Sequence, residues 1–161
     1  MTEPDVLAAL RAYADAHDGW LACDFELADD GDELAEGFLR DEPLARSFDV
    51  FGHDKMLGLY ARWRSDEAPV VYLAADWDET GVLCDDLEDF VALLTLGRDR
   101  IGMLGDWDAD QEPCEGIDEF RGWAERELGI EPATAEDARA MVERARAAHP
   151  DLKAWIEDRR R

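Results

Sequence analysis

The sequence has few basic residues and no long hydrophobic run. Its 161 residues include 17 Lys and Arg against 41 Asp and Glu, a formal net charge of −24. Such a surface repels phosphate backbones and anionic lipids, which argues against direct binding of nucleic acids or membranes. No apolar run approaches the roughly 18 residues of a membrane-spanning helix. The acidic start MTEPDV lacks the pattern of a signal peptide, so we expect a cytoplasmic protein.

Cysteine and histidine are also scarce. Cys23, Cys84 and Cys114 are far apart and form no C-x-x-C pair, which favours reduced thiols over a disulfide framework or a zinc ribbon. Cys84 is expected in the core, because free cysteine is among the most buried residue types. The three histidines show no paired spacing, and we predict no metal site and no cofactor. His53 and Asp54 fall in a predicted turn, where both are ordinary residues.

The segment VVYLAADWDET resembles the nucleophile loop of haloacid dehalogenase-type phosphatases. In such an enzyme Asp76 would attack phosphorus and Asp78 would act as general acid and base. That chemistry needs a nearby cation, and the only lysine after Thr80 is Lys153, close to the end of the sequence. The alternation of strands and helices typical of that fold is missing. An acidic turn after a buried strand is therefore favoured over a phosphatase.

Two acidic loops resemble the first half of an EF-hand calcium loop. They are DWDETG, residues 76–81, and DWDADQ, residues 106–111. The twelfth position of each loop falls on Leu87 or Ile117, where a bidentate Glu is required. We expect no dedicated calcium site, and weak binding of divalent cations stays open.

The apolar pattern predicts a block of strands between two blocks of helices. Alternation over residues 57–64 predicts a strand with one buried face, and the apolar run Val70–Ala75 predicts an interior strand. Short connections favour antiparallel neighbours. The predicted fold is α+β, with a mostly antiparallel sheet of about four to six strands flanked by N- and C-terminal helices, in one domain over residues 1–161. Further predicted strands are 20–27, 47–51 and 82–84; predicted helices are 4–17, 32–40, 86–97, 118–129, one from Thr134 to before Pro150, and one from Asp151.

Acidic residues are concentrated in residues 65–120, which hold 17 of them against Arg98 and Arg100. This charge either keeps the protein surface well hydrated or steers a basic partner toward it. Two tryptophans in this region lie between aspartates. They either pack back on the core or form aromatic anchors within an acidic rim, a composition typical of binding hot spots. The candidate partner-binding residues are Asp76, Trp77, Asp78, Glu79, Asp106, Trp107 and Asp108.

Two longer stretches resemble the SUKH superfamily, the Smi/Knr-type domains. In Phe48–Gly97, a hairpin containing LGLYARW is followed by the apolar strand VVYLAAD and the helix DLEDFVALLTLG. Asp118–Asp158 resembles the C-terminal helical region of actinobacterial-type members. The resemblance implies an α+β fold with a mostly antiparallel sheet, and it implies no catalysis. Many bacterial relatives are immunity proteins, which neutralise toxins that are often nucleases.

The resemblance and the charge together predict a non-catalytic immunity protein that binds a cognate toxin stoichiometrically. A nuclease needs a basic groove for its substrate, and an acidic protein complements such a groove. The expected partner is thus a toxin or another basic protein, with neither nucleic acid nor membrane bound. The alternatives are a general SUKH-type interaction or scaffold domain and the phosphatase that uses Asp76 and Asp78.

Overall fold

The computed structural model describes residues 3–108 and 112–160 of the chain. Within these residues, five strands form one open antiparallel sheet whose spatial order follows the chain. The strands are β1 (Glu26–Leu27), β2 (Phe48–His53), β3 (Leu59–Trp63), β4 (Val70–Leu73) and β5 (Gly81–Cys84). The predicted α+β fold, with an antiparallel sheet flanked by N- and C-terminal helices, is confirmed.

The α-helices are α1 (Glu3–Ala16), α2 (Gly31–Leu39), α3 (Glu42–Ala45), α4 (Leu87–Leu94), α5 (Ile117–Trp123), α6 (Ala135–Ala148) and α7 (Leu152–Arg159). Helix α1 precedes the sheet in the chain, α2 and α3 lie between β1 and β2, and the remaining α-helices follow β5. Short 3₁₀ segments are η1 (Trp77–Glu79) and η2 (Leu104–Asp108), and a π-helical turn, η3 (Ala124–Leu128), extends α5. No helix in the described part of the chain combines the length and apolar composition needed to cross a membrane.

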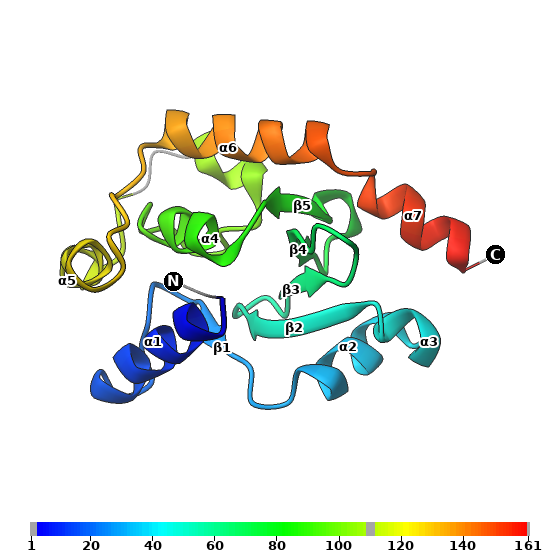
Figure 1. Ribbon diagram of the computed structural model, residues 1–161, viewed down its shortest axis with the longest axis horizontal. Coiled ribbons are helices and arrows are strands. Elements are labelled where there is room, and N and C mark those ends of the chain that lie inside the picture. Colours follow the sequence, from blue (N-terminus) through cyan, green and yellow to red (C-terminus); the bar gives the residue numbers. More distant parts are fainter. Residues whose placement is uncertain (1–2, 109–111, 161) are drawn as a thin grey trace.

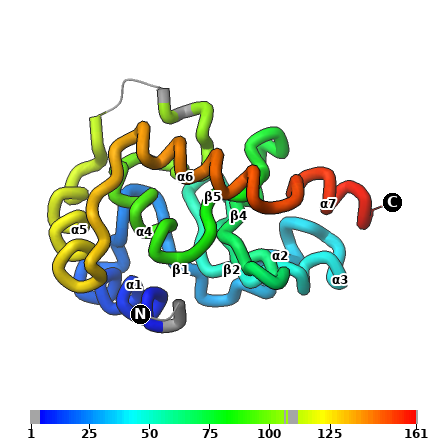
Figure 2. Tube along the Cα trace, turned by 45° about the horizontal axis from the view of Figure 1, so that its top comes forward, coloured from blue at the N-terminus to red at the C-terminus, as the bar shows by residue number. Residues whose placement is uncertain are grey.

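Helices cover both faces of the sheet. Figure 1 shows β2 to β5 stacked one above the other, with α1, α4 and α5 on one side and α2, α3 and α7 on the other. Helix α6 runs across β5 at the edge of the sheet and leads into α7 (Figures 1 and 2). The sheet therefore separates two hydrophobic clusters, one under each group of helices.

Aspartate side chains begin several of these helices. Asp86 accepts a hydrogen bond from the Asp89 backbone N–H at the start of α4, and Thr134 and Asp137 form a capping box at the start of α6. Each such bond satisfies a helical N–H that has no partner within its own helix. Part of the acidic excess thus has a local structural role. Asp30, Asp41 and Asp151 cap α2, α3 and α7 in the same way.

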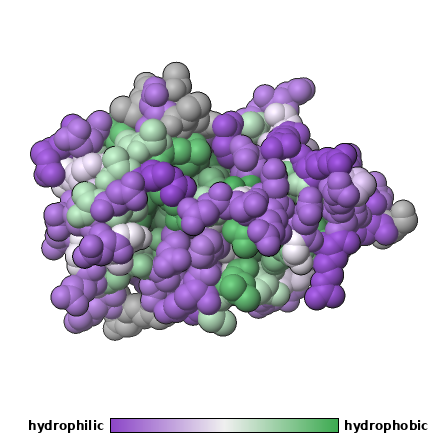
Figure 3. Space-filling model, turned by 90° about the horizontal axis from the view of Figure 1, so that it is seen from below, coloured by the Kyte–Doolittle hydropathy of each residue, from purple (hydrophilic) through white to green (hydrophobic). Residues whose placement is uncertain are grey.

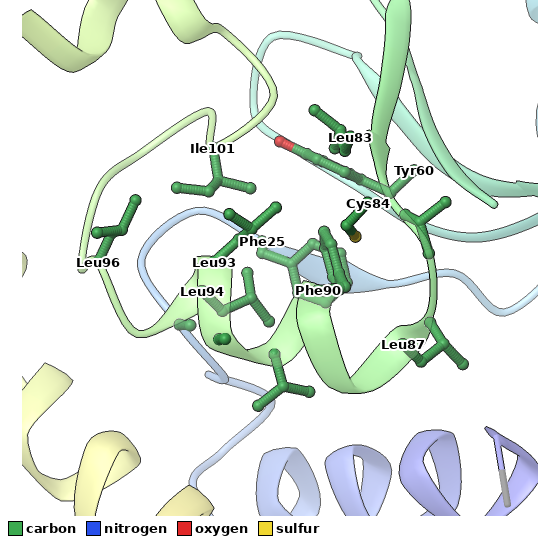
Figure 4. Packing of buried hydrophobic residues seen from close by; sticks show 14 of the residues in the cluster. Phe25, Tyr60, Leu83, Cys84, Leu87, Phe90, Leu93, Leu94, Leu96 and Ile101 are labelled. Atoms are coloured by element: carbon green, nitrogen blue, oxygen red, sulfur yellow. The ribbon is translucent and has the colours of Figure 1, made fainter. Parts of the chain in front are cut away.

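Strand β3 is buried on both faces, so the prediction of one buried face is wrong. Leu59, Ala61 and Trp63 face the cluster under α2, α3 and α7. Tyr60 points the other way and packs against Phe90 of α4, as Figure 4 shows. The predicted alternation holds from Leu59 to Trp63, and the second face is covered by elements that lie far from β3 in the sequence.

Several predicted boundaries differ from the structure, and two of them have a clear backbone cause. The helix predicted to start at Asp118 begins at Ile117 after Gly116, whose φ of 87° suits glycine. Asp118 lies in its first turn and forms an ion pair with Arg121. In the predicted strand over residues 20–27, only β1 is paired as a strand, because Cys23 adopts a left-handed backbone with φ of 54° that breaks the extended run.

Cys23 and Cys114 form a disulfide, so the prediction of three reduced thiols is wrong. Their Cα atoms are 5.6 Å apart, and 91 positions separate them in the sequence. The bond ties the segment after α1 to the segment before α5. No sequence pattern reveals this pair, because the fold alone brings the two segments together. Cys84 is free and buried, as predicted.

We predict that losing the disulfide lowers the free energy of unfolding by roughly 2–4 kcal/mol, because the bond restricts the unfolded chain. The measurement is urea unfolding of the wild-type chain with and without dithiothreitol, beside the variant Cys114→Ser. The variant should match the reduced wild type and show no further response to reductant. Equal stability of all forms would contradict a structural role for the bond.

Candidate protein-binding surface

The acidic segment after β4 forms a short capped turn on the surface. The Asp76 carboxylate accepts a hydrogen bond from the Asp78 backbone N–H at 3.3 Å and so begins η1. Both aspartates are exposed, whereas Trp77 is half-buried against the cluster under α2, α3 and α7. The Trp77 indole donates a hydrogen bond to Glu157 at 3.0 Å, and the guanidinium of Arg160 lies 5.6 Å from the ring centre. Trp77 therefore joins η1 to α7.

Trp107, the second tryptophan between aspartates, packs into the core. Its side chain is 3% exposed. Its indole donates a hydrogen bond to the Ile101 carbonyl at 3.1 Å, and the guanidinium of Arg139 lies 5.4 Å from its ring centre. Of the two interpretations, packing back on the core applies to Trp107. The side chains of Asp106 and Asp108 lie outside the part of the structure that is described.

The two acidic segments lie beside each other although they are far apart in the sequence. A Cβ built on Gly105 of η2 would lie 3.0 Å from a carboxylate oxygen of Glu79 in η1. The structure thus brings Glu79 next to the segment that holds Trp107. The exposed charges beside this contact are those of Asp76 and Asp78 in η1, whereas Trp107 belongs to the core.

Two cations lie next to this surface. The Lys153 ammonium of α7 donates a hydrogen bond to the Asp78 carbonyl at 3.3 Å, and Arg146 of α6 donates one to the Val82 carbonyl at 2.9 Å. Partial burial lowers the pKa of Arg146, and the charge of Glu79 acts in the opposite direction. Asp78, Arg146 and Lys153 help line a pocket of about 330 Å³. Lys153, although close to the end of the sequence, therefore lies beside Asp78, because α7 packs against β5 and bonds to η1.

The turn between β2 and β3 contains a buried carboxylate, so the prediction that Asp54 is an ordinary turn residue is wrong. Asp54 is 1% exposed. Its Oδ1 accepts hydrogen bonds from the backbone N–H groups of Met56 and Gly58, each at 3.0 Å. Its Oδ2 accepts from the hydroxyls of Tyr60 at 3.1 Å and Tyr72 at 2.8 Å. A buried charge is tolerated only when it is hydrogen-bonded, and here both oxygens are used.

Tyr72 occupies a slot between two glycines. A Cβ at Gly58 or at Gly102 would collide with the Tyr72 side chain. The Gly102 backbone N–H also donates to the Tyr60 hydroxyl at 3.1 Å, which adds the segment after α4 to the network. Burial is the main cause that raises the pKa of both Tyr60 and Tyr72, so both hydroxyls stay protonated and donate to Asp54.

A second carboxylate, Asp24, lies near this network. Its Oδ1 accepts a hydrogen bond from the Arg100 backbone N–H at 2.8 Å. Burial raises the pKa of Asp24, and the charges of Asp54 and Asp99 raise it further. Lys55, in the turn itself, forms an ion pair with Asp99 at 3.0 Å. The turn after β2 is therefore fixed by a buried network on one side and by a surface ion pair on the other.

This fixed turn exposes two apolar side chains. Among the described residues, Met56 at 53% and Leu57 at 75% are the large hydrophobic residues that stand out as exposed. Leu57 has a φ of 64°, in the left-handed region that disfavours branched side chains. Its N–H donates to the Asp54 carbonyl at 3.0 Å. Sequence reasoning counted Leu57 with the buried face of a strand and so missed its exposure.

The comparisons with protein-family models, curated proteins and solved structures find no match to this chain. Membership of the SUKH superfamily therefore stays a prediction that rests on the residues quoted above. In residues 3–108 and 112–160, no cluster of three or more His, Cys, Asp or Glu residues has a geometry that could hold a metal ion.

We predict that Tyr72→Phe lowers the free energy of unfolding by about 1.5–3 kcal/mol, because it removes a hydrogen bond to a charged group. The measurement is urea unfolding at neutral pH. Tyr13→Phe is the matched control, since the buried Tyr13 hydroxyl has no hydrogen-bond partner in the described structure. That control should be neutral or slightly stabilising. Equal effects of the two substitutions would contradict the role given to Asp54.

Proposed function

We propose that this chain is a non-catalytic binding protein whose acidic surface captures a basic protein partner. The observation that carries the proposal is that carboxylates of the acidic region remain at the surface of the folded chain. A field of one sign raises the encounter rate with an oppositely charged partner and disfavours wrong ones. The exposed acidic residues between positions 65 and 120 include Asp66, Glu67, Asp76, Asp78, Asp85, Glu88, Glu112, Glu115, Asp118 and Glu119.

The finer proposal is that the partner is a bacterial toxin and the chain is its immunity protein. Support comes from the resemblance to SUKH domains over Phe48–Gly97 and Asp118–Asp158. A nuclease toxin presents a basic groove to its substrate, which makes it a suitable target for an acidic protein. A general interaction or scaffold domain of the same type would use the same surface for a different basic partner.

The proposed place of action is the cytoplasm. Cytosolic thiol systems keep most cysteines reduced. The proposal therefore requires that the chain stay folded and bind its partner when Cys23 and Cys114 are thiols. The two hydrophobic clusters on either side of the sheet would keep the chain folded without the disulfide.

One observation favours the second candidate, a phosphatase that uses Asp76 and Asp78. Lys153 lies within hydrogen-bond distance of the Asp78 carbonyl, so a cation is present near the segment. Against it, Asp76 and Asp78 lie in the connection of an antiparallel pair, β4 and β5, and Asp76 is engaged in capping η1. Hydrolysis of p-nitrophenyl phosphate that is lost in Asp76→Asn would support this candidate.

The proposed function predicts that co-expression with a toxin encoded by a neighbouring gene restores growth and yields a stoichiometric complex. The double variant Asp76→Ser and Asp78→Ser should weaken that complex several-fold, because it removes charge at the candidate surface while serine can still cap η1. The matched control is Glu125→Ser with Glu127→Ser, which removes the same charge from exposed positions after α5. Isothermal titration calorimetry measures the affinities.

The proposal would be contradicted if co-expression did not restore growth and no complex formed with any neighbouring gene product. A complex that forms without growth rescue would favour the general interaction domain. Equal weakening by the two double variants would show that net charge acts without a preferred surface, and would remove the η1 segment from the site.

A further inference from the structure

A wide groove lies between α2 and the ends of three strands. It has a volume of about 840 Å³. Its apolar lining comes from Leu34 and Phe38 of α2, from Leu57 and Leu59 at the start of β3, and from Ala75 after β4. Figure 3, which views the molecule from the side of α1, α2 and α3, shows apolar side chains reaching the surface between hydrophilic ones.

Hydrogen bonds from a buried carboxylate hold the wall of this groove. Leu57, which lines it, keeps 75% of its surface exposed in a left-handed backbone conformation. The buried Asp54 carboxylate binds the N–H groups on either side of it, those of Met56 and Gly58. A strained conformation persists only where the surroundings determine it, and such strain concentrates at functional sites. The buried network therefore presents an apolar side chain to solvent at a fixed position.

The rim of the groove is acidic, which favours a basic occupant. Asp29, Asp30 and Glu33 line it at the start of α2. The basic groups of the lining are Arg40 at the end of the helix and the imidazole of His53, which lies 3.7 Å from a Glu26 carboxylate oxygen. Asp29 pairs with Arg11 at 3.5 Å, and both side chains are at least half exposed, so this pair is weak in water. An apolar floor with an acidic rim complements an apolar side chain that has basic neighbours.

We propose that this groove binds a segment of the partner protein in which apolar side chains are flanked by Lys or Arg. The inference rests on the proposed function, because it gives the basic partner a specific contact surface. The apolar side chain enters between Leu34, Phe38 and Leu57, and its basic neighbours meet Asp29, Asp30 and Glu33. The η1 and η2 segments then act on the partner through long-range charge, and the groove makes the close apolar contact.

The test uses a short synthetic peptide in which two leucines are flanked on each side by two lysines. The full-length chain, labelled with ¹⁵N, is titrated with this peptide, and amide shifts give both the affinity and the site. Shifts should concentrate in α2 and in residues 54–59. Replacing the leucines by serines, or the lysines by glutamates, should weaken binding by roughly tenfold or more, because a buried leucine or a complementary charge is lost.

Two variants of the chain sharpen the test. Leu57→Asn removes the apolar side chain while suiting the left-handed conformation, so it should bind roughly tenfold more weakly at unchanged thermal stability. Glu33→Lys should weaken peptide binding more than Glu143→Lys, which makes the same charge change on an exposed position of α6. Glu143 thus controls for net charge.

Peptide binding with shifts on other surfaces would overturn the groove and leave the proposed function standing. Equal effects of Glu33→Lys and Glu143→Lys, or full affinity of Leu57→Asn, would overturn it as well. Absence of any peptide binding would also overturn it, whereas the proposed function is decided separately by complex formation in co-expression.

Discussion

The buried Asp54 carboxylate accepts hydrogen bonds from two backbone N–H groups and two tyrosine hydroxyls. These bonds join the turn after β2 to Tyr60 of β3 and Tyr72 of β4, and Gly102 extends the network beyond α4. A charge at 1% exposure would be costly without these donors. The network therefore fixes the relative position of segments that hydrophobic packing alone would leave free to shift.

This constraint links the core to the surface. The same carboxylate that stabilises the middle of the sheet holds the backbone around Leu57, whose side chain lines the groove beside α2. The acidic residues have two distinct roles. Some, such as Asp86, cap helices, and others, such as Asp78, leave their charge in water. The exposed carboxylates would attract a basic partner over a long range, and the groove would contact it at short range.

Local patterns predicted much of the fold, and long-range contacts account for the errors. The Asp86 cap of α4 and the all-buried β4 follow from signals within a few residues. The Cys23–Cys114 bond and the approach of Lys153 to Asp78 depend on how distant segments pack. Of the candidate site, the exposure of Asp76 and Asp78 agrees with a surface role. The groove at Leu57 was missed because a polar turn gives no sign that its aspartate is buried.

We propose that an acidic surface of defined shape captures a basic protein. The most direct test is the rate of association with the partner that co-expression identifies, measured by stopped-flow at increasing ionic strength. Between about 0.01 M and 0.1 M salt the Debye length shortens from roughly 30 Å to about 10 Å. The association rate constant should fall steeply over this range while the fold is unchanged. A rate constant that does not change with salt would contradict this proposal.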